Sequence, residues 1–183
     1  MFKITQQKPN NKSSDNHIED LLDAAFGEGR HNKRSYHFRE GVADVPDLRF
    51  VTHYDNTLVG TIRFWPVMIQ NPATSLSTHG TKALLLGPLG VALHMQGRGI
   101  GADLIHHGIN AARTQGHGII ILVGELNYYG RFGFGPAASP QHPITMPGEQ
   151  DHRVLIRELH NDALEGVQGT IESLTNLEAV SAA

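Results

Sequence analysis

A glycine-rich segment between two apolar stretches of different periodicity is the feature that most constrains the fold. Residues 96–101 read Gln-Gly-Arg-Gly-Ile-Gly. The preceding run, residues 83–93, is apolar and interrupted only by glycine and proline, which favours a buried strand with a bulge or a splayed end. Residues 99–115 follow with apolar side chains at helical spacing, which predicts an amphipathic helix that Gly116 ends. The glycines therefore connect a buried strand to a helix N-terminus.

This connection is suited to binding a phosphate group. The first four amides of a helix lack internal partners, and the helix dipole adds about half a positive charge there. Glycine lets a phosphate approach those amides, and Arg98 adds a full charge. Two other interpretations stay open: a plain strand-to-helix turn, and a dinucleotide-binding turn with Glu125 as its distant acid. The second is less favoured, because the glycines follow an apparent hairpin in mid-chain, and a Walker motif is absent.

The remaining pattern predicts a mixed α/β (α+β) chain. Asp55-Asn56-Thr57 is a turn between two stretches rich in β-branched and aromatic residues, which predicts a hairpin. The segment from 30 to 47 is charged and ambiguous, with room for a short helix. The other expected elements are strands at 2–5, 48–54, 58–69, 119–123, 153–159 and 167–171, helices at 17–26 and 127–132, and loops at 71–81 and 139–150.

Composition excludes several classes of protein and site. A length of 183 residues predicts about one domain, which we place at residues 1–175, before a frayed tail at 176–183. The absence of cysteine rules out disulfides, thiolate metal sites and a cysteine nucleophile. A net charge of −3 and the lack of a long apolar stretch argue against nucleic-acid and membrane binding, so we expect a cytoplasmic protein. The 12 histidines show no metal-ligand spacing, so we expect no metal site.

Three segments in this order resemble the GNAT superfamily of acyl-CoA-dependent N-acetyltransferases. They are the apolar run at 84–91, the glycine segment at 96–101 and the segment Tyr-Gly-Arg-Phe-Gly-Phe at 129–134. The run Leu-Gly-Pro-Leu-Gly-Val at 86–91 and the doubled Tyr128-Tyr129 are similar to a subgroup of small bacterial predicted acetyltransferases. The resemblance covers roughly residues 15–135. It implies a mixed, mostly antiparallel sheet whose fourth and fifth strands splay apart, with helices on both faces.

The resemblance also implies that acetyl-CoA enters the splay between those strands. Its pantetheine arm would meet the backbone of the apolar run, and its pyrophosphate would meet the amides of the glycine segment. The implied acetyl-CoA-binding residues are Leu89, Gly90, Val91, Gln96, Gly97, Arg98, Gly99, Ile100, Gly101, Ala102, Asn127 and Phe132.

Two residues carry the implied chemistry. Tyr129 aligns with the family's tyrosine and would donate a proton to the departing thiolate. Two alternatives stay open: the Tyr129 ring only packs under the turn at 133–134, or Tyr128 donates the proton instead. Some relatives carry a glutamate on the fourth strand, but residues 83–93 contain no carboxylate. Glu125 is the substitute base that we expect, unless it is only a rim acid. Trp65 and Arg63 would line the acceptor site, with core packing as the favoured alternative for Trp65.

The resemblance thus predicts transfer of an acetyl group from acetyl-CoA to an unidentified primary amine, directly within a ternary complex, because a cysteine thioester intermediate is impossible here. Two rival functions remain. One is a non-catalytic acyl-CoA-binding module on the same fold, and the other is a dinucleotide-dependent oxidoreductase. A homodimer is compatible with the fold, since such proteins often pair sheet edges.

Overall fold

The computed structural model describes residues 2–7, 12–71 and 80–175. Within these residues, nine strands form one mixed sheet whose main path runs β1-β2-β3-β4-β5-β8-β6, while β9 pairs with β3, and β7 pairs with β9. Two pairs, β4 with β5 and β7 with β9, are parallel, and the other pairs are antiparallel. The strands are β1 (Lys3–Gln6), β2 (Phe50–Tyr54), β3 (Thr57–Gln70), β4 (Thr81–Val91), β5 (Ile119–Val123), β6 (Gly135–Pro136), β7 (Ile144–Thr145), β8 (Val154–Glu158) and β9 (Gly169–Ser173).

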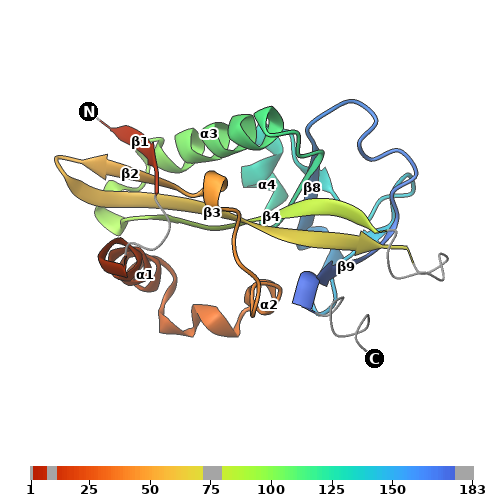
Figure 1. Cartoon of the computed structure of the whole chain (residues 1–183), viewed down its shortest axis with the longest axis horizontal. Helices are drawn as coiled ribbons and strands as arrows, with labels where there is room; N and C mark the ends of the chain where they lie inside the picture. The colour runs from red at the N-terminus through yellow and green to blue at the C-terminus, as the bar shows by residue number, and fades with distance from the viewer. Residues whose placement is uncertain (1, 8–11, 72–79, 176–183) are drawn as a thin grey trace.

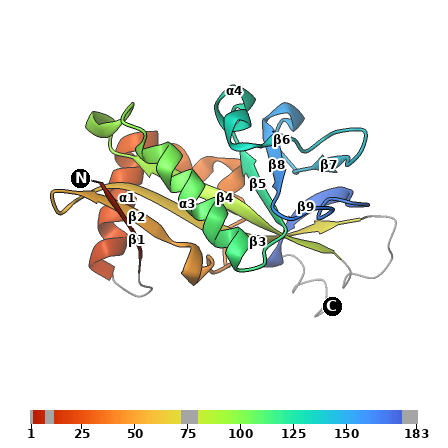
Figure 2. The ribbon, with the colours of Figure 1, turned by 90° about the horizontal axis from the view of Figure 1, so that it is seen from above.

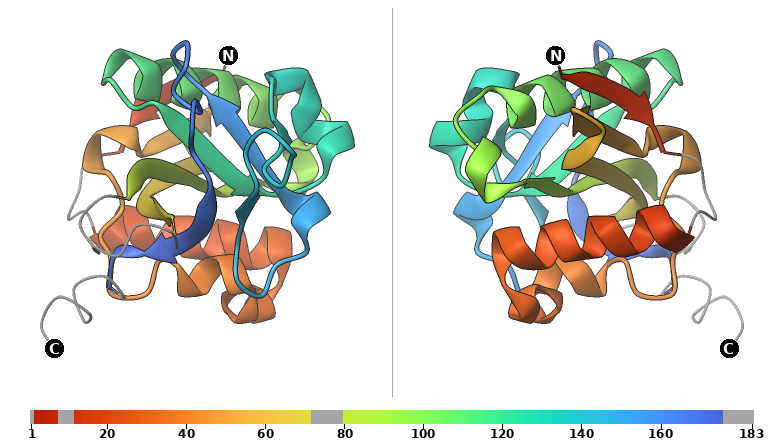
Figure 3. Two further views of the ribbon diagram at one scale, coloured as in Figure 1. Left: turned by 90° about the vertical axis from the view of Figure 1, so that its right-hand side faces the viewer. Right: turned by 90° about the vertical axis from the view of Figure 1, so that its left-hand side faces the viewer.

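Helices cover both faces of this sheet (Figures 1 and 3). Helix α3 (Ile100–Thr114) lies on one face, whereas α1 (Lys12–Phe26) and α2 (Arg34–His37) lie on the other. The short α4 (Leu126–Tyr129) follows β5 on the α3 side. Strands β4 and β5 are buried on both faces because their apolar side chains alternate: Leu84 and Leu86 pack in the core under α3, and Leu85 packs in the core on the opposite face.

The carboxyl ends of β4 and β5 diverge (Figure 2). The two strands pair only through Leu84 with Ile120 and Leu85 with Ile121. Beyond these pairs β4 stays with β3 and β5 stays with β8. The register of β3 against β4 shifts across Gly87 and Pro88, which forms the bulge that the sequence predicts. The splayed, mostly antiparallel sheet expected from the sequence is therefore confirmed.

Most expected elements are confirmed, with ends that differ by a few residues. Asp55 and Asn56 have positive φ values of 47° and 64°, as a tight hairpin turn between β2 and β3 requires. Helix α3 ends just before Gly116, whose φ of 83° is the left-handed conformation of a helix-ending glycine. The segment from 139 to 150, expected as loop, contains the two-residue strand β7, and the last strand lies at Gly169–Ser173. Most of the loop expected at 71–81, and the tail expected at 176–183, lie outside the described residues.

Helix α1 is the largest correction, because it begins at Lys12 rather than at residue 17. Hydrophobic spacing detects the helix only from Ile18, its first fully buried apolar residue. The preceding turn is held by polar contacts instead: Asp15 accepts hydrogen bonds from Gln7 at 2.7 Å and from Arg63 at 2.9 Å. Polar contacts of this kind leave no hydrophobic periodicity in the sequence.

Candidate functional site

Two cavities meet where β4 and β5 diverge. The first, here called the α3 groove, has a volume of about 590 Å³ and runs from β4 along the start of α3 to α4. The second, the α2 pocket, has a volume of about 380 Å³ and lies between the segment around α2 and the ends of β4 and β5. Phe26, Leu89 and Tyr129 line both cavities, so these three residues mark the junction. A ligand in the groove and a ligand in the pocket would meet there.

The glycine segment forms one end of the α3 groove. Gly97 and Gly99 have φ values of 76° and 85°, which side chains other than glycine rarely adopt. No heavy atom lies within 4 Å of the position of a Cβ at either glycine, so the space beside them is open. The first turn of α3 thus presents its amides to a groove with room for an anionic group.

Most of the expected groove residues line this cavity. They are Leu89, Val91, Gln96, Gly97, Gly99, Ile100, Gly101 and Ala102. Gly90 instead faces α1, where a Cβ would lie 2.6 Å from a methyl of Leu22. Arg98 and Asn127 are exposed and line neither cavity. Phe132 is 3% exposed and packs edge-on against His106 at 5.1 Å between ring centroids, so it belongs to the core.

The groove also contains residues that the sequence analysis did not name as acetyl-CoA-binding residues. Arg131 lines it, with its guanidinium 4.3 Å from the centre of the Tyr128 ring. Phe26 and Tyr128 line it as well, and both are unusually exposed for large apolar or aromatic residues. The doubled tyrosine was the available signal for Tyr128, whereas Phe26 comes from a helix far away in the sequence.

Tyr129 is held at the junction by its neighbours. Its ring lies so close to Gly124 that a side chain at 124 would collide with it, and it also packs against Phe134 at 6.1 Å between ring centroids. Burial, with a smaller contribution from Tyr128, raises the pKa of the Tyr129 hydroxyl to about 12. The phenol is therefore neutral and able to donate a hydrogen bond across the physiological pH range.

Glu125 lies apart from both cavities. Its carboxylate is mostly exposed and forms an ion pair of 3.2 Å with Arg153. The carboxylate that lines the α2 pocket belongs to Glu149, which comes from the loop between β7 and β8. Sequence analysis missed Glu149 because that proline-rich loop has no pattern that connects it to the strands.

The α2 pocket is rich in basic side chains. Lys33, Arg34, Arg39 and Arg153 line it, together with the single acid Glu149. Burial of the Arg39 guanidinium lowers its pKa to about 10, so the group stays charged at neutral pH. The density of charge at residues 30–47 is the only sequence signal for Lys33, Arg34 and Arg39, and it does not reveal which of these side chains turn inward.

Trp65 and Arg63 lie beside the pocket rather than in it. They line a third, side cavity of about 250 Å³. Tyr36, Arg39 and Pro88 line both the side cavity and the α2 pocket, so they form the partition between the two.

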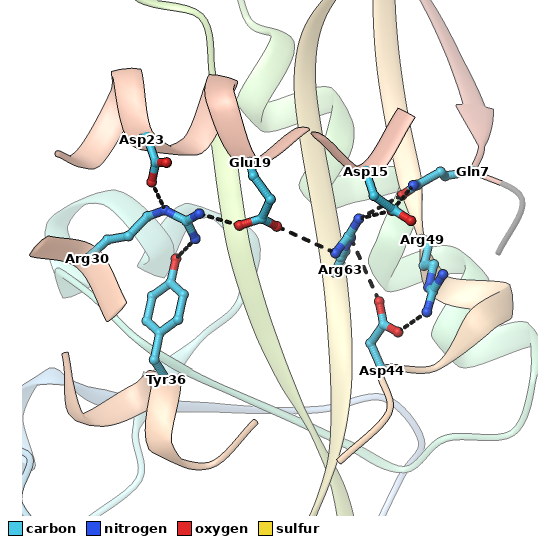
Figure 4. A network of polar contacts seen from close by, with 9 residues as sticks. All are labelled: Gln7, Asp15, Glu19, Asp23, Arg30, Tyr36, Asp44, Arg49 and Arg63. Atoms are coloured by element: carbon cyan, nitrogen blue, oxygen red, sulfur yellow. Dashed lines mark hydrogen bonds and ion pairs between the residues drawn. The ribbon is translucent and has the colours of Figure 1, made fainter. Parts of the chain in front are cut away.

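A network of ion pairs fixes the segment that carries this wall (Figure 4). Arg30 is almost fully buried and contacts Glu19, Asp23 at 2.6 Å and the hydroxyl of Tyr36 at 3.0 Å. Burial alone would lower the pKa of Arg30, but these hydrogen bonds raise it above its ordinary value. Since the acids belong to α1 and Tyr36 belongs to α2, the network joins α1 to the wall of the pocket.

Two further findings concern the helices and the metal-ligating side chains of the described residues. Among residues 2–7, 12–71 and 80–175, none of the helices combines the length and apolar character that a membrane-crossing helix needs. The same part of the chain brings together no group of three or more His, Cys, Asp or Glu side chains able to hold a metal ion.

Comparisons with known proteins agree with this geometry. A sequence model of the Acetyltransferase (GNAT) family matches residues 16–134. The chain is 29% identical to YjhQ, an uncharacterized N-acetyltransferase of Escherichia coli K12, over 78% of this chain and 76% of that protein.

The chain shares its fold with crystal structures of YhbS from Escherichia coli in complex with CoA and of a GNAT acetyltransferase from Brucella melitensis in complex with acetyl-CoA. YhbS has a TM-score of 0.73 and 23% identity over 94% of this chain and 88% of that chain. The Brucella protein has a TM-score of 0.65 and 23% identity over 94% and 95% of the two chains. Because the family match spans more than half of its length, this protein belongs to the GNAT acetyltransferase family.

Proposed function

We propose that this protein transfers an acetyl group from acetyl-CoA, bound in the α3 groove, to a primary amine that enters through the α2 pocket. The observation that carries the proposal is the meeting of the two cavities at Leu89 and Tyr129. The membership in the GNAT family and the CoA and acetyl-CoA complexes of two proteins with the same fold support it.

The residues of the α3 groove fit acetyl-CoA. The open space beside Gly97 and Gly99 suits a pyrophosphate at the N-terminus of α3, and Arg131 adds a positive charge to the groove. The exposed side chains of Phe26 and Tyr128 offer apolar surface for the rest of the molecule. In the described residues no strand pairs with β4 on the β5 side after Leu85, which leaves room for a pantetheine arm along β4. When bound there, acetyl-CoA supplies an acyl group activated as a thioester.

The transfer requires the nitrogen of a neutral amine to form a bond with the acyl carbon while the carbon–sulfur bond breaks. We assign to Glu149 the removal of the proton from the amine, because it is the acid that lines the α2 pocket. We assign to Tyr129 the stabilisation of the departing thiolate. A thiol has a pKa near 8.5, well below the value of about 12 for Tyr129, so the tyrosine would donate a hydrogen bond rather than give up its proton.

Replacing the catalytic tyrosine tests this function. For Tyr129→Phe we expect kcat to fall by about 10²-fold, because one hydrogen-bond donor to the developing charge is lost. The affinity for acetyl-CoA should change less than about threefold, since the ring and its packing remain. The matched control Tyr54→Phe, at a residue on β2 that lines neither cavity, should keep full activity. Steady-state kinetics with a panel of amines and equilibrium binding of CoA provide the two measurements.

Unchanged kcat in Tyr129→Phe would remove the assigned role. A thermal-shift titration with acetyl-CoA, CoA and NADH separates the rival functions, since a ligand at 100 times its Kd adds about 2.7 kcal/mol of stability. A shift with both CoA species but no turnover of any amine would favour an acyl-CoA-binding module, for which the absence of a carboxylate in residues 83–93 is an argument. A shift with NADH alone would favour an oxidoreductase.

A further inference from the structure

The α2 pocket contains more positive charge than the protein itself neutralises. Of its four basic side chains, only Arg153 forms an ion pair within the described residues, and its partner Glu125 lies outside the pocket. Lys33 instead lies 5.1 Å from the centre of the Phe26 ring. Arg34 packs against the backbone at Gly148. Even if Glu149 offsets one of these charges, the pocket retains a surplus of cations.

Arg39 is the clearest case, because its environment differs from that of the other buried arginines. Arg30 has two carboxylate partners in Glu19 and Asp23, and Arg49 has one in Asp44. Arg39 has no carboxylate partner among the described residues, and its buried Nε and Nη1 atoms have no hydrogen-bond partner. Its guanidinium lies over the Tyr36 ring, 4.4 Å from the ring centre.

The surrounding structure keeps this guanidinium in place. A Cβ at Gly87 would lie 2.9 Å from Nη2 of Arg39, so a glycine at the β4 bulge makes the space that the guanidinium occupies. The residues on either side of Arg39 are fixed by the C-terminal end of the sheet. Ser173 donates a hydrogen bond of 3.2 Å to the carbonyl of Phe38, and Thr175 donates one of 2.9 Å to the carbonyl of Glu40. A buried cation without a carboxylate partner costs stability, and this one is held in position at the wall of a substrate-sized cavity.

We propose that the acceptor is a small amine that also carries a carboxylate, and that Arg39, assisted by Arg34, binds this carboxylate in the α2 pocket. A planar guanidinium matches a carboxylate in charge and shape. A cavity of about 380 Å³ is at the small end of ligand sites, which suits a molecule of amino-acid size. Since Tyr129 lines the same pocket, an acceptor held by its carboxylate can direct its amine towards the junction. The proposal rests on the proposed acetyl transfer and specifies its substrate class.

Matched pairs of amines test the recognition of the carboxylate. The probes are the standard amino acids and their carboxamides, assayed with acetyl-CoA by the wild-type protein, Arg39→Met and Arg39→Lys. We expect wild-type kcat/KM to be at least tenfold higher for the best amino acid than for its amide. In Arg39→Met this ratio should fall at least tenfold, while KM for acetyl-CoA stays within about twofold, and Arg39→Lys should recover part of the ratio. Comparing the ratio between variants cancels the different basicities of the two amines.

The control for these assays is Lys82→Met, which removes an exposed cation that lines neither cavity. It should leave the ratio unchanged. Equal kcat/KM for acids and amides in the wild-type protein, or a ratio that Arg39→Met does not alter, would overturn the proposal. A clear preference for an aminoalkylphosphonate over the matched amino acid would overturn the choice of a carboxylate.

Stability provides a readout that does not depend on turnover. Without ligand, Arg39→Met should raise the urea midpoint, because it removes a buried charge that has no carboxylate partner among the described residues. Arg30→Met should lower the urea midpoint, because Glu19 and Asp23 lose their ion pairs with Arg30. With CoA present, the preferred amino acid should raise Tm in the wild-type protein but not in Arg39→Met. If Arg39→Met is destabilised like Arg30→Met and no such rise in Tm occurs, Arg39 is structural and the proposal fails. If no amine is acetylated, the proposed function fails. The rise in Tm that amino acids cause in the presence of CoA then decides by itself whether the pocket binds a carboxylate.

Discussion

At the scale of single residues, the position of Tyr129 depends on the absence of a side chain at Gly124. A Cβ there would collide with the edge of the tyrosine ring. We therefore expect Gly124→Ala to displace the ring and to lower kcat by about 10-fold or more, with binding of CoA little changed. Gly135→Ala is the matched control, because a Cβ at 135 would meet nothing within 4 Å and φ there is not positive. Kinetics of the two variants would check this, and an active Gly124→Ala would show that the ring tolerates displacement.

The raised pKa of Tyr129 has a consequence for stability at high pH. Burial favours the neutral phenol, with a pKa of about 12 in the folded protein against about 10 in the unfolded chain. The stabilising contribution is therefore complete below about pH 10 and is lost as the pH rises from about 10 to 12. Tyr129→Phe lacks this loss, so the wild-type protein should lose stability relative to the variant between pH 9 and pH 11. Urea unfolding at both pH values measures the difference, and a constant difference would mean that the hydroxyl is solvated.

The part of the α3 groove formed by the glycine segment could be predicted from the sequence, whereas the charged residues of the α2 pocket could not. Groove residues such as Gly97 and Gly99 occupy one continuous segment between a strand and a helix, so their spacing carries the signal. Arg39 lies more than 100 residues before Glu149 and Arg153, and these residues line one pocket only because the fold brings them together. Neither periodicity nor local motifs record such a meeting, and for this reason the sequence points to Glu125 as the base and carries no signal for Glu149.

At the scale of elements, the strongest patterns were the most reliable. Helix α3 matched its expected ends within one residue, because its buried face follows helical spacing along its whole length. The first turn of α1 has no such pattern, because its contacts with Gln7 and Arg63 are polar. Hydrophobic periodicity thus predicts the elements that the core holds, and misses those that ion pairs hold.

The buried face of α3 should dominate its contribution to stability. Leu104 is fully buried between α3 and the sheet, so Leu104→Ala should lower the free energy of unfolding by about 2–5 kcal/mol. Asn110 lies on the exposed face of the same helix and offers the control. Asn110→Ala should change the free energy of unfolding by less than about 0.5 kcal/mol. Urea unfolding at 25 °C gives both values. A small effect of Leu104→Ala would indicate that the core closes around the lost side chain.

At the scale of the whole molecule, strands β1 to β4 pair with the later strands β5 to β9 at only two places within the described residues. Strand β4 meets β5 through two residue pairs, and β9 returns to pair with β3. A ligand in the α3 groove would contact both β4 and α4, so binding of CoA should slow amide hydrogen exchange at the end of β4, the first turn of α3 and α4. Exchange in β1 and β2, which do not line the groove, should be unaffected. Uniform protection throughout the chain, measured by mass spectrometry, would contradict this arrangement.

The hydrogen bonds from Ser173 and Thr175 join the residues flanking Arg39 to the C-terminal end of the sheet, so the wall of the α2 pocket depends on a distant part of the chain. The family match ends at residue 134, while Glu149, Arg153 and this C-terminal strand all follow it. Under the proposed function, substitutions after residue 134 would therefore alter one wall of the α2 pocket while the glycine segment stays unchanged. We expect such substitutions to change the choice of amine without weakening the binding of CoA.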